Sequence, residues 1–204
     1  MTVDSSVTSS GSPVLKVLTR STYQSDDVLA PITVLLSPID QFKVWFKSAQ
    51  EDPRVFEPET MTLATASADG IPSARIVLLK SVDERGFTLY TNYTSRKSNE
   101  LQANPRAALT FYWREHHRQV RVVGRAEMVD RRESEEYFQS RPVGSRIGAW
   151  ASRQSTVVAG GAVQERFAKL EERFGVKDSG GETGNEEPQI PLPEFWGGWR
   201  IIPE

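Results

Sequence analysis

The sequence contains no cysteine among its 204 residues, and it contains only two histidines. The absence of cysteine excludes disulfides, thiolate metal sites and cysteine nucleophiles. His116 and His117 are adjacent, so they cannot supply the spaced ligands that a metal site needs. We interpret the pair as a polar turn between two strands rather than as catalytic residues.

Common nucleotide-binding and hydrolase signatures are also missing. The sequence has no P-loop, no G-x-G-x-x-G, no H-E-x-x-H and no G-x-S-x-G motif. Any phosphate group bound by this protein is therefore expected to be held by side chains. The formal net charge of −2 argues against a general attraction to nucleic acid.

Targeting segments are not evident either. No apolar run is long enough to cross a bilayer, and the first residues lack the hydrophobic core of a secretion signal. No arginine precedes Arg20, which argues against a transit peptide, so we expect a cytoplasmic protein without a membrane partner. Residues 1–19 have the composition of a disordered tail, and residues 178–188 that of a flexible insertion in a domain spanning 20–204.

The pattern of apolar residues predicts a mainly β protein of the α+β class. About six strands are expected, at 61–68, 75–80, 87–92, 106–114, 119–129 and 195–202. Helices are expected at 38–51, 95–103, 131–140 and 163–174, with a loop at 143–155. Hairpins join most of the strands and no β-α-β alternation occurs, so we expect a small antiparallel barrel with peripheral helices.

Four cations stand at strand ends and at a helix start within the segment 75–101, namely Arg75, Lys80, Arg96 and Lys97. Such a grouping is typical of a phosphate site. The first turn of a helix normally favours acidic residues, but here it carries two cations behind Ser95, the expected cap. The alternative is that both cations are simply solvated on an exposed turn.

The spacing of these residues adds a geometric expectation. Arg75 and Lys80 are an odd number of residues apart, so a regular strand would point them to opposite faces. Two anionic ligands, or one site shared between subunits, would suit that arrangement. Tyr137 and Arg141 are four residues apart and share one face of a helix end, although Tyr137 alone could be a packing residue.

A further strand has a regular polar face. Gln119, Arg121 and Val123 share one side of it, opposite Val120 and Val122. This side faces either solvent or a ligand cavity, and the residues alone do not decide between the two.

Five motifs in register resemble the pyridoxamine 5′-phosphate oxidase family, whose FMN-dependent enzymes make pyridoxal 5′-phosphate. The motifs are GIPSARIVLLK (70–80), YTNYTSRK (90–97), RQVRVVG (118–124), YFQSRPVGSRIGAWASRQS (137–155) and PEFWGGWR (193–200). The resemblance covers the chain from about Arg20 to its last residue, in order and with the family's spacing.

The resemblance implies a split β-barrel homodimer that holds two FMN molecules at the subunit interface. The FMN phosphate region would be held by Arg75, Arg96, Lys97 and Ser155. Further FMN contacts would come from Tyr90, Thr91, Gln119 and Gln154, from the backbone of Ile76, Val77, Leu78 and Leu79, and from Lys80. The substrate would be bound by Lys80, Tyr137, Arg141 and Ser145, and an N-terminal segment containing Arg20 and Tyr23 would cover it.

The implied reaction is the oxidation of pyridoxine or pyridoxamine 5′-phosphate to pyridoxal 5′-phosphate. A hydride passes from C4′ of the substrate to N5 of the flavin, and O2 reoxidises the flavin and forms hydrogen peroxide. With the amine substrate, the imine product hydrolyses and releases ammonia. Since the flavin supplies the chemistry, no catalytic acid or base residue is expected.

The sequence departs from the family at its C-terminal side. Family members continue past the W-G-G-W-R strand into a further strand with a flavin-contacting tryptophan and an R-x-H-D-R segment, whereas this sequence ends at Glu204. Trp196 belongs to the earlier motif and does not replace that tryptophan. A fragment or alternative product of a longer enzyme, or a short homologue, would both explain the difference, and we expect markedly reduced oxidase activity.

Two other functional readings stay open. One is a protein that binds FMN or pyridoxal 5′-phosphate with little or no turnover. The other is a reductase of the wider split-barrel superfamily with a different cofactor, which accounts poorly for the predicted substrate residues. Oxygen consumption with pyridoxine 5′-phosphate distinguishes an oxidase from a protein that only binds its ligands. The absorbance spectrum of the bound chromophore tests for a reductase with a different cofactor.

Overall fold

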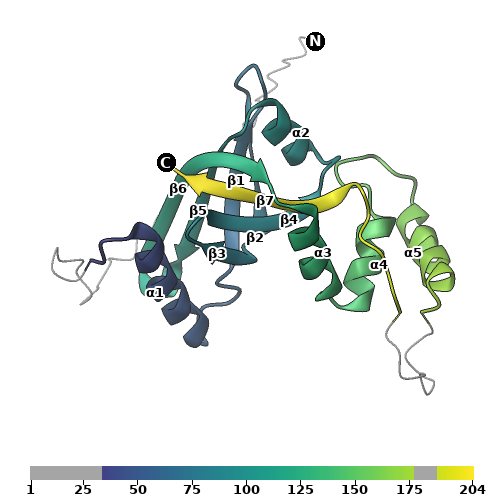
Figure 1. The fold of residues 1–204 in the computed structure, drawn as a ribbon, viewed down its shortest axis with the longest axis horizontal. Coiled ribbons are helices and arrows are strands. Elements are labelled where there is room, and N and C mark those ends of the chain that lie inside the picture. The colour runs from purple at the N-terminus through teal and green to yellow at the C-terminus, as the bar shows by residue number, and fades with distance from the viewer. Residues whose placement is uncertain (1–33, 177–187) are drawn as a thin grey trace, which may run out of the picture.

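One curled antiparallel sheet forms the frame of the molecule. A computed structural model describes residues 34–176 and 188–204. Within them, seven strands form the sheet in the order β2-β1-β5-β6-β7-β4-β3 (Figure 1). The strands are β1 (Thr60–Ala66), β2 (Pro72–Leu78), β3 (Ser81–Asp83), β4 (Gly86–Asn92), β5 (Arg106–Trp113), β6 (Arg118–Met128) and β7 (Trp196–Pro203). The predicted mainly β class, with an antiparallel barrel-like sheet and peripheral helices, is confirmed.

Two details of the strand prediction are wrong. Strand β2 ends at Leu78, so Lys80 lies in the connection to β3 and not on the strand. The alternation that would point Lys80 and Arg75 to opposite faces therefore does not apply to them. The prediction of about six strands misses β3, because three residues are too few to show an alternating pattern.

Several predictions fall outside the described residues. They include the tail at 1–19, the segment with Arg20 and Tyr23, and all but the last residue of the insertion at 178–188. Among the helices of residues 34–176 and 188–204, none is long and apolar enough to cross a membrane.

The main core fills the inner face of the sheet. Alternate residues of β1 and β5 are buried there, as expected for strands with one covered face. Helix α1 (Pro38–Glu51) begins at the predicted proline and closes this core with Phe42. The Phe42 ring lies 4.8 Å from the Phe87 ring and 4.9 Å from the Phe111 ring, so α1 is fixed by aromatic packing.

The described residues form four further α-helices, namely α2 (Arg96–Ala103), α3 (Arg131–Gln139), α4 (Val143–Ala151) and α5 (Ala162–Arg173), of which α3, α4 and α5 lie together on one side of the sheet (Figure 1). The prediction of a loop at 143–155 is wrong over its first nine residues, which form α4. Ile147 and Ala151 lie one turn apart and are buried, but Gly144, Ser145 and Gly148 lower the helix propensity of the segment. Helices α3, α4 and α5 share a second, smaller core built around Phe138.

The predicted polar turn between β5 and β6 is confirmed. Arg114–His116 form a single 3₁₀ turn, and His117 closes it in the left-handed conformation with φ of 50°. The His116 Nε2 atom lies 2.9 Å from Asp52 Oδ2, so this turn contacts the end of α1.

Strand β7 holds helix α3 by polar contacts. The backbone N–H of Gly198 donates to Ser134 Oγ at 3.2 Å, and Arg200 donates to Glu133 Oε1 at 2.5 Å. Arg131 donates to three backbone carbonyls in and just before the start of β7, at 2.9–3.0 Å. The position of α3, and of the residues at its C-terminal end, therefore depends on β7.

We expect Gly198→Ala to destabilise the fold. A Cβ atom at this position would lie 2.8 Å from Tyr90 Cε1 and 2.8 Å from the Val129 side chain, closer than real contacts allow. Overpacking of this kind costs about 1–3 kcal/mol, and the free energy of unfolding measured in denaturant should fall by that amount. The matched control is Gly144→Ala in α4, where nothing lies within 4 Å of the new Cβ, so stability should stay level or rise. Equal stability of both variants would contradict the prediction.

Candidate functional site

A cavity of about 930 Å³ lies where strands β2 and β4 meet helices α2, α3 and α4. Most of the residues predicted from the sequence line it, namely Arg75, Ile76, Val77, Leu78, Lys80, Tyr90, Thr91, Arg96, Lys97, Tyr137, Arg141, Ser145, Gln154 and Ser155. Arg75 and Lys80, whose spacing predicted that they would point to opposite faces of a strand, both line this one cavity.

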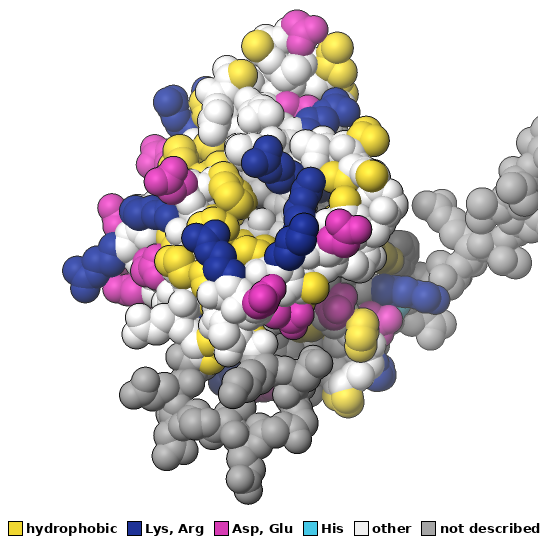
Figure 2. All heavy atoms as spheres, turned by 90° about the vertical axis from the view of Figure 1, so that its right-hand side faces the viewer, with side chains coloured by type: hydrophobic (Ala, Val, Ile, Leu, Met, Phe, Trp, Pro, Cys, Tyr) yellow, Lys and Arg dark blue, Asp and Glu magenta, His cyan; other side chains and the backbone are white. Residues whose placement is uncertain are grey.

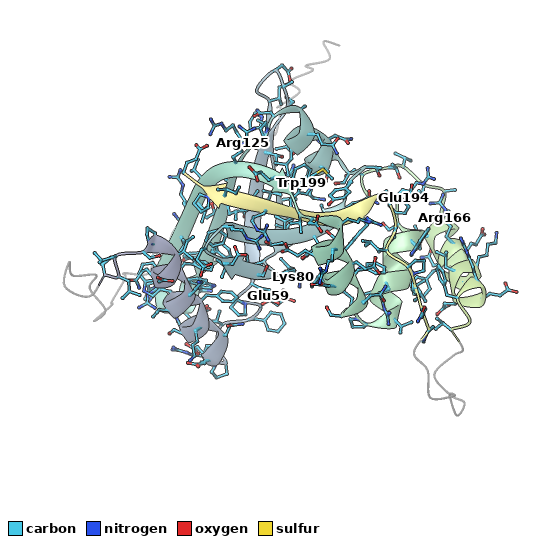
Figure 3. All side chains as sticks on the ribbon, viewed as in Figure 1. Glu59, Lys80, Arg125, Arg166, Glu194 and Trp199 are labelled. Atoms are coloured by element: carbon cyan, nitrogen blue, oxygen red, sulfur yellow. The ribbon has the colours of Figure 1, made fainter. Side chains whose placement is uncertain are left out.

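The lining is strongly cationic. Among the described residues it includes five arginines and lysines and no acidic side chain. Lys80 lies beside α3 in the view of Figure 3. Figure 2 shows that lysine and arginine side chains also gather on the face that carries the helices, with hydrophobic side chains between them. The cavity therefore suits a ligand with negative charge and apolar surface.

Some predicted residues lie elsewhere. Leu79, predicted to contact FMN through its backbone, is not among the lining residues, and its side chain is buried in the main core. Gln119 lies on β6 opposite Tyr112, exposed and away from the lining. Arg20 and Tyr23 lie outside the described residues.

Other lining residues are not singled out by the sequence analysis. They are Ser73, Asn92, Pro142, Gly148, Ala149, Ser152 and Trp196. All seven stand inside the five motifs, which is the one signal that could have identified them. Most are small or uncharged, so their residue types alone do not indicate a ligand site.

Lys97 is a buried cation without an acidic partner among the described residues. It is 7% exposed, and its Nζ atom donates to Gln154 Oε1 at 2.5 Å and to Thr91 Oγ1 at 3.2 Å. Burial, together with the nearby charge of Arg75, lowers the pKa of Lys97 to about 8. Of the two readings of the α2 cations, full solvation is excluded for Lys97. An anion in the cavity would stabilise its ammonium form.

Arg75 and Arg96 share the carboxylate of Glu100. Arg75 Nη2 lies 3.3 Å from Glu100 Oε2, and Arg96 Nε donates to Oε1 at 2.8 Å. Although burial opposes it, hydrogen bonds from Thr65 and Arg96 hold the pKa of Glu100 below its usual value. Arg75 also donates to Leu63 O, Thr65 Oγ1 and Ser73 Oγ, so its terminal nitrogens are already occupied by protein acceptors.

The start of α2 is held in a way that the sequence does not predict. Ser95 occupies the expected N-cap position of α2, but its side chain makes no capping hydrogen bond. Instead, Ser98 Oγ donates to the carbonyl of Asn92 at 3.0 Å and accepts from the indole N–H of Trp199 at 3.0 Å. Strand β7 thereby fixes the helix turn that presents Arg96 and Lys97.

Arg141 provides a second cationic group at the end of α3. Its guanidinium lies 4.8 Å from the centre of the Trp196 ring, and its buried Nη1 atom has no hydrogen-bond partner within residues 34–176 and 188–204. Burial lowers the pKa of Arg141, although the group remains a cation at neutral pH. A buried donor without a partner is costly, and an acceptor on a ligand would satisfy it.

Stacked aromatic rings form one wall of the cavity. The rings of Tyr90 and Tyr137 lie 4.0 Å apart at 15°, and Trp196 stacks on Tyr90 at 5.6 Å and 11°. Burial raises the pKa of Tyr90 to about 12, so its hydroxyl stays protonated and can donate a hydrogen bond. Tyr137 packs against the second core and also lines the cavity.

The fold and the cavity together define a split-barrel protein with a cationic, aromatic-walled binding site. The family model of pyridoxamine 5′-phosphate oxidase matches residues 49–172. The chain belongs to the pyridoxamine 5′-phosphate oxidase family, a family of oxidoreductases.

Named relatives agree with this assignment. The pyridoxine/pyridoxamine 5′-phosphate oxidase of Bordetella petrii is 50% identical over 184 residues, which cover 90% of this chain and 81% of the relative. That of Burkholderia mallei is 54% identical over 168 residues, covering 82% and 72%. The crystal structure of PhzG from Burkholderia lata, in complex with tetrahydrophenazine-1-carboxylic acid, has a TM-score of 0.75 and 32% identity, covering 87% of this chain and 82% of PhzG.

A solved structure with lower identity supports the fold. A pyridoxamine 5′-phosphate oxidase-related, FMN-binding protein from Nostoc punctiforme has a TM-score of 0.58 at 15% identity. It covers 82% of this chain and 81% of its own, so the split barrel extends over most of both proteins.

We expect Lys97 to titrate near pH 8 in the free protein. Its ammonium form is destabilised by burial and by Arg75, so the amine gains a proton only below that pH. NMR of ¹³C-methylated lysines should show one signal with this midpoint, and that signal should be missing in Lys97→Met. A bound phosphate-bearing ligand should raise the midpoint, because the anion favours the charged form. The absence of any lysine signal with a midpoint near 8 would contradict the prediction.

Proposed function

We propose that this chain is an FMN-dependent oxidase of pyridoxine 5′-phosphate and pyridoxamine 5′-phosphate. It would use O2 and form pyridoxal 5′-phosphate and hydrogen peroxide, with ammonia released from the amine substrate. Family membership supports the reaction class. The observation that carries the proposal is that one cavity contains two sets of cations on different elements, one beside α2 and one beside α3 and α4. The phosphates of a flavin and of a substrate would use one set each.

The residues beside α2 fit the phosphate of FMN. Lys97 lacks a counter-anion, and only Nε of Arg96 is seen hydrogen-bonded in the described part of the chain, which leaves its terminal nitrogens for a ligand. Ser155 lines the same region. Arg75 would contribute mainly charge, because its terminal nitrogens are already bonded to protein acceptors. We propose these residues as the phosphate ligands, with Tyr90, Thr91 and Gln154 as further FMN contacts.

The residues beside α3 and α4 fit the phosphate of the substrate. Arg141 offers a buried N–H group without a partner. Lys80, Ser145 and Tyr137 line the same cavity and add an ammonium and two hydroxyls. This combination of donors suits a phosphate dianion, which accepts several charge-assisted hydrogen bonds.

The role of the protein in the reaction is binding and orientation. FMN would supply the redox chemistry that takes a hydride from C4′ of the substrate and delivers the electrons to O2. The stacked wall of Tyr90, Tyr137 and Trp196 would keep water from one side of the reacting rings. Because the described lining contains no carboxylate or imidazole, the proton of the substrate's C4′ hydroxyl would pass to water.

A homodimer explains the position of Gln119. This predicted FMN contact lies on the outer face of β6 and outside the cavity of its own chain. Strand β2 is an edge strand, and its residues Ile76 and Leu78 line the cavity although both are also exposed. A second copy packed on this edge would close the cavity and bring its own Gln119 to it. We therefore propose that FMN is bound between two subunits.

The direct test is a spectroscopic titration of the purified chain with FMN, followed by anaerobic addition of pyridoxine 5′-phosphate. We expect a bound flavin whose absorbance bleaches, because the substrate reduces it. A flavin that stays oxidised would replace the oxidase proposal with a binding function. If no flavin binds, the cofactor assignment is wrong.

We expect Arg141→Met to weaken the substrate and not the flavin. Loss of a charged hydrogen bond costs about 1.5–3 kcal/mol, so the KM for pyridoxine 5′-phosphate should rise about 10- to 100-fold. The Kd of FMN should stay within about twofold, since FMN uses the other cations. Arg132→Met is the matched control, because this arginine is exposed on α3, which ends two residues before Arg141, and pairs only with Glu136 among described residues. A KM that is unchanged in Arg141→Met would refute the assignment.

A further inference from the structure

The outer face of strands β2, β1, β5 and β6 is built from rows of paired residues. In one row Ile76 lies opposite Thr62, Thr62 opposite Thr110, and Thr110 opposite Arg121. The next row consists of Ala74, Ala64, Ala108 and Val123. Residues paired in this way point to the same side of the sheet. We call the eight residues of these two rows the outer rows.

The outer rows are small or apolar with one exception. Ile76 is 64% exposed and Val123 is 50% exposed, and neighbouring Tyr112 is 56% exposed. An exposed apolar surface of this kind marks an interaction site. Arg121 is the one charged residue of the outer rows, and it is exposed. Arg121 therefore places one positive charge in a surface whose other residues are suited to burial in a protein–protein interface.

Arg121 does not reach the cavity of its own chain where that cavity borders strand β2. It lies three strands away from Ile76, which corresponds to about 14 Å along the hydrogen-bonding direction of the sheet. Ile76, in contrast, belongs to the outer rows and also lines the cavity. The cavity and the outer rows thus meet at strand β2, at the far end of the row from Arg121.

A two-fold axis through the middle of the outer rows would exchange their two ends. In an isologous dimer both subunits use the same surface, so the β6 end of the outer rows in one subunit contacts the β2 end in its partner. Strand β6 of one copy would then cross β2 of the other, and each Arg121 would lie at the mouth of the partner's cavity. The same packing would bury the guanidinium, which is costly unless an anion neutralises it. The outer rows contain no acidic residue that could do so.

We propose that Arg121 of each subunit binds the anionic flavin held in the partner's cavity. The inference rests on the proposed FMN site and homodimer, and it adds a cation that no residue of the cavity's own chain supplies. The ligand provides the negative charge that the interface lacks, so binding and dimer formation support each other. Arg121 is accordingly a ligand-binding residue contributed in trans.

The first test compares Arg121→Gln with Arg125→Gln. Arg125 stands on the same strand and the same face, away from Lys80 toward the end of β6 (Figure 3). Flavin fluorescence should show a Kd for FMN at least about tenfold higher in Arg121→Gln and unchanged within about twofold in Arg125→Gln. Sedimentation velocity should show dimers for both variants. An unchanged Kd in Arg121→Gln, or conversion of that variant to monomers with FMN present, would overturn the proposal.

The second test separates action in trans from action in cis by mixing two defective chains. Arg121→Gln is co-refolded with Lys97→Met, whose own cavity lacks the buried ammonium. If Arg121 acts in trans, each mixed dimer has one cavity with both defects and one intact cavity. Equal amounts should then yield about a quarter of wild-type high-affinity FMN sites, since half of the dimers are mixed and each has one intact site of two. If no high-affinity site forms although mixed dimers are recovered, Arg121 does not act in trans.

The outcomes also distinguish this inference from the function on which it rests. If the wild-type chain is monomeric or binds no FMN, the proposed function itself is contradicted. A wild-type dimer that binds FMN, together with an Arg121→Gln dimer of equal affinity, would remove only the role of Arg121.

Discussion

Strand β7 is the constraint on which the rest of the structure depends. It pairs with β6 on one side and β4 on the other, so it joins the β2-β1-β5-β6 part of the sheet to β4-β3. It also fixes both helices that present the cations of the cavity, through Trp199 to Ser98 in α2 and through Gly198 to Ser134 in α3. These contacts link residues far apart in sequence, so the geometry of the cavity depends on long-range interactions with β7.

The site is maintained at a cost to the stability of the fold. Lys97 is buried beside another cation, and a nitrogen of Arg141 is buried without a partner. A core built for stability alone would replace both residues with apolar groups, because unpaired buried charge is unfavourable. The surrounding structure offsets this cost with apolar packing, as in the Phe42 cluster and the stacked rings around Trp196. A bound anion would recover part of that cost as binding free energy, which explains why the cations are kept in place.

The sequence predicts much of this architecture, for identifiable reasons. Helix α1 and the hairpins have strong periodicity and turn signals, and the Arg96–Lys97 pair is visible because it breaks the charge preference of a helix start. The predictions fail where the decisive interaction is tertiary. Helix α4 is stabilised by its packing and not by propensity, and no local pattern reveals that Trp199 holds α2 from the far end of the chain. Likewise, the contact of Arg75 with buried Glu100 is made only by the fold, whereas Arg96 reaches Glu100 within α2.

The one predicted residue whose position conflicts with a single-chain site is also the most informative. Gln119 does not line the cavity of its own chain. Either the resemblance misassigns this residue, or a second subunit also contacts the ligand. The sheet favours the second explanation, because Ile76 belongs to both the cavity lining and the exposed outer face. An edge strand with exposed apolar side chains is a liability in a monomer, yet it is a natural boundary between two copies. In the proposed homodimer, three features that are unfavourable in one chain would be resolved together: the open cavity, the uncovered sheet face and the exposed charge of Arg121.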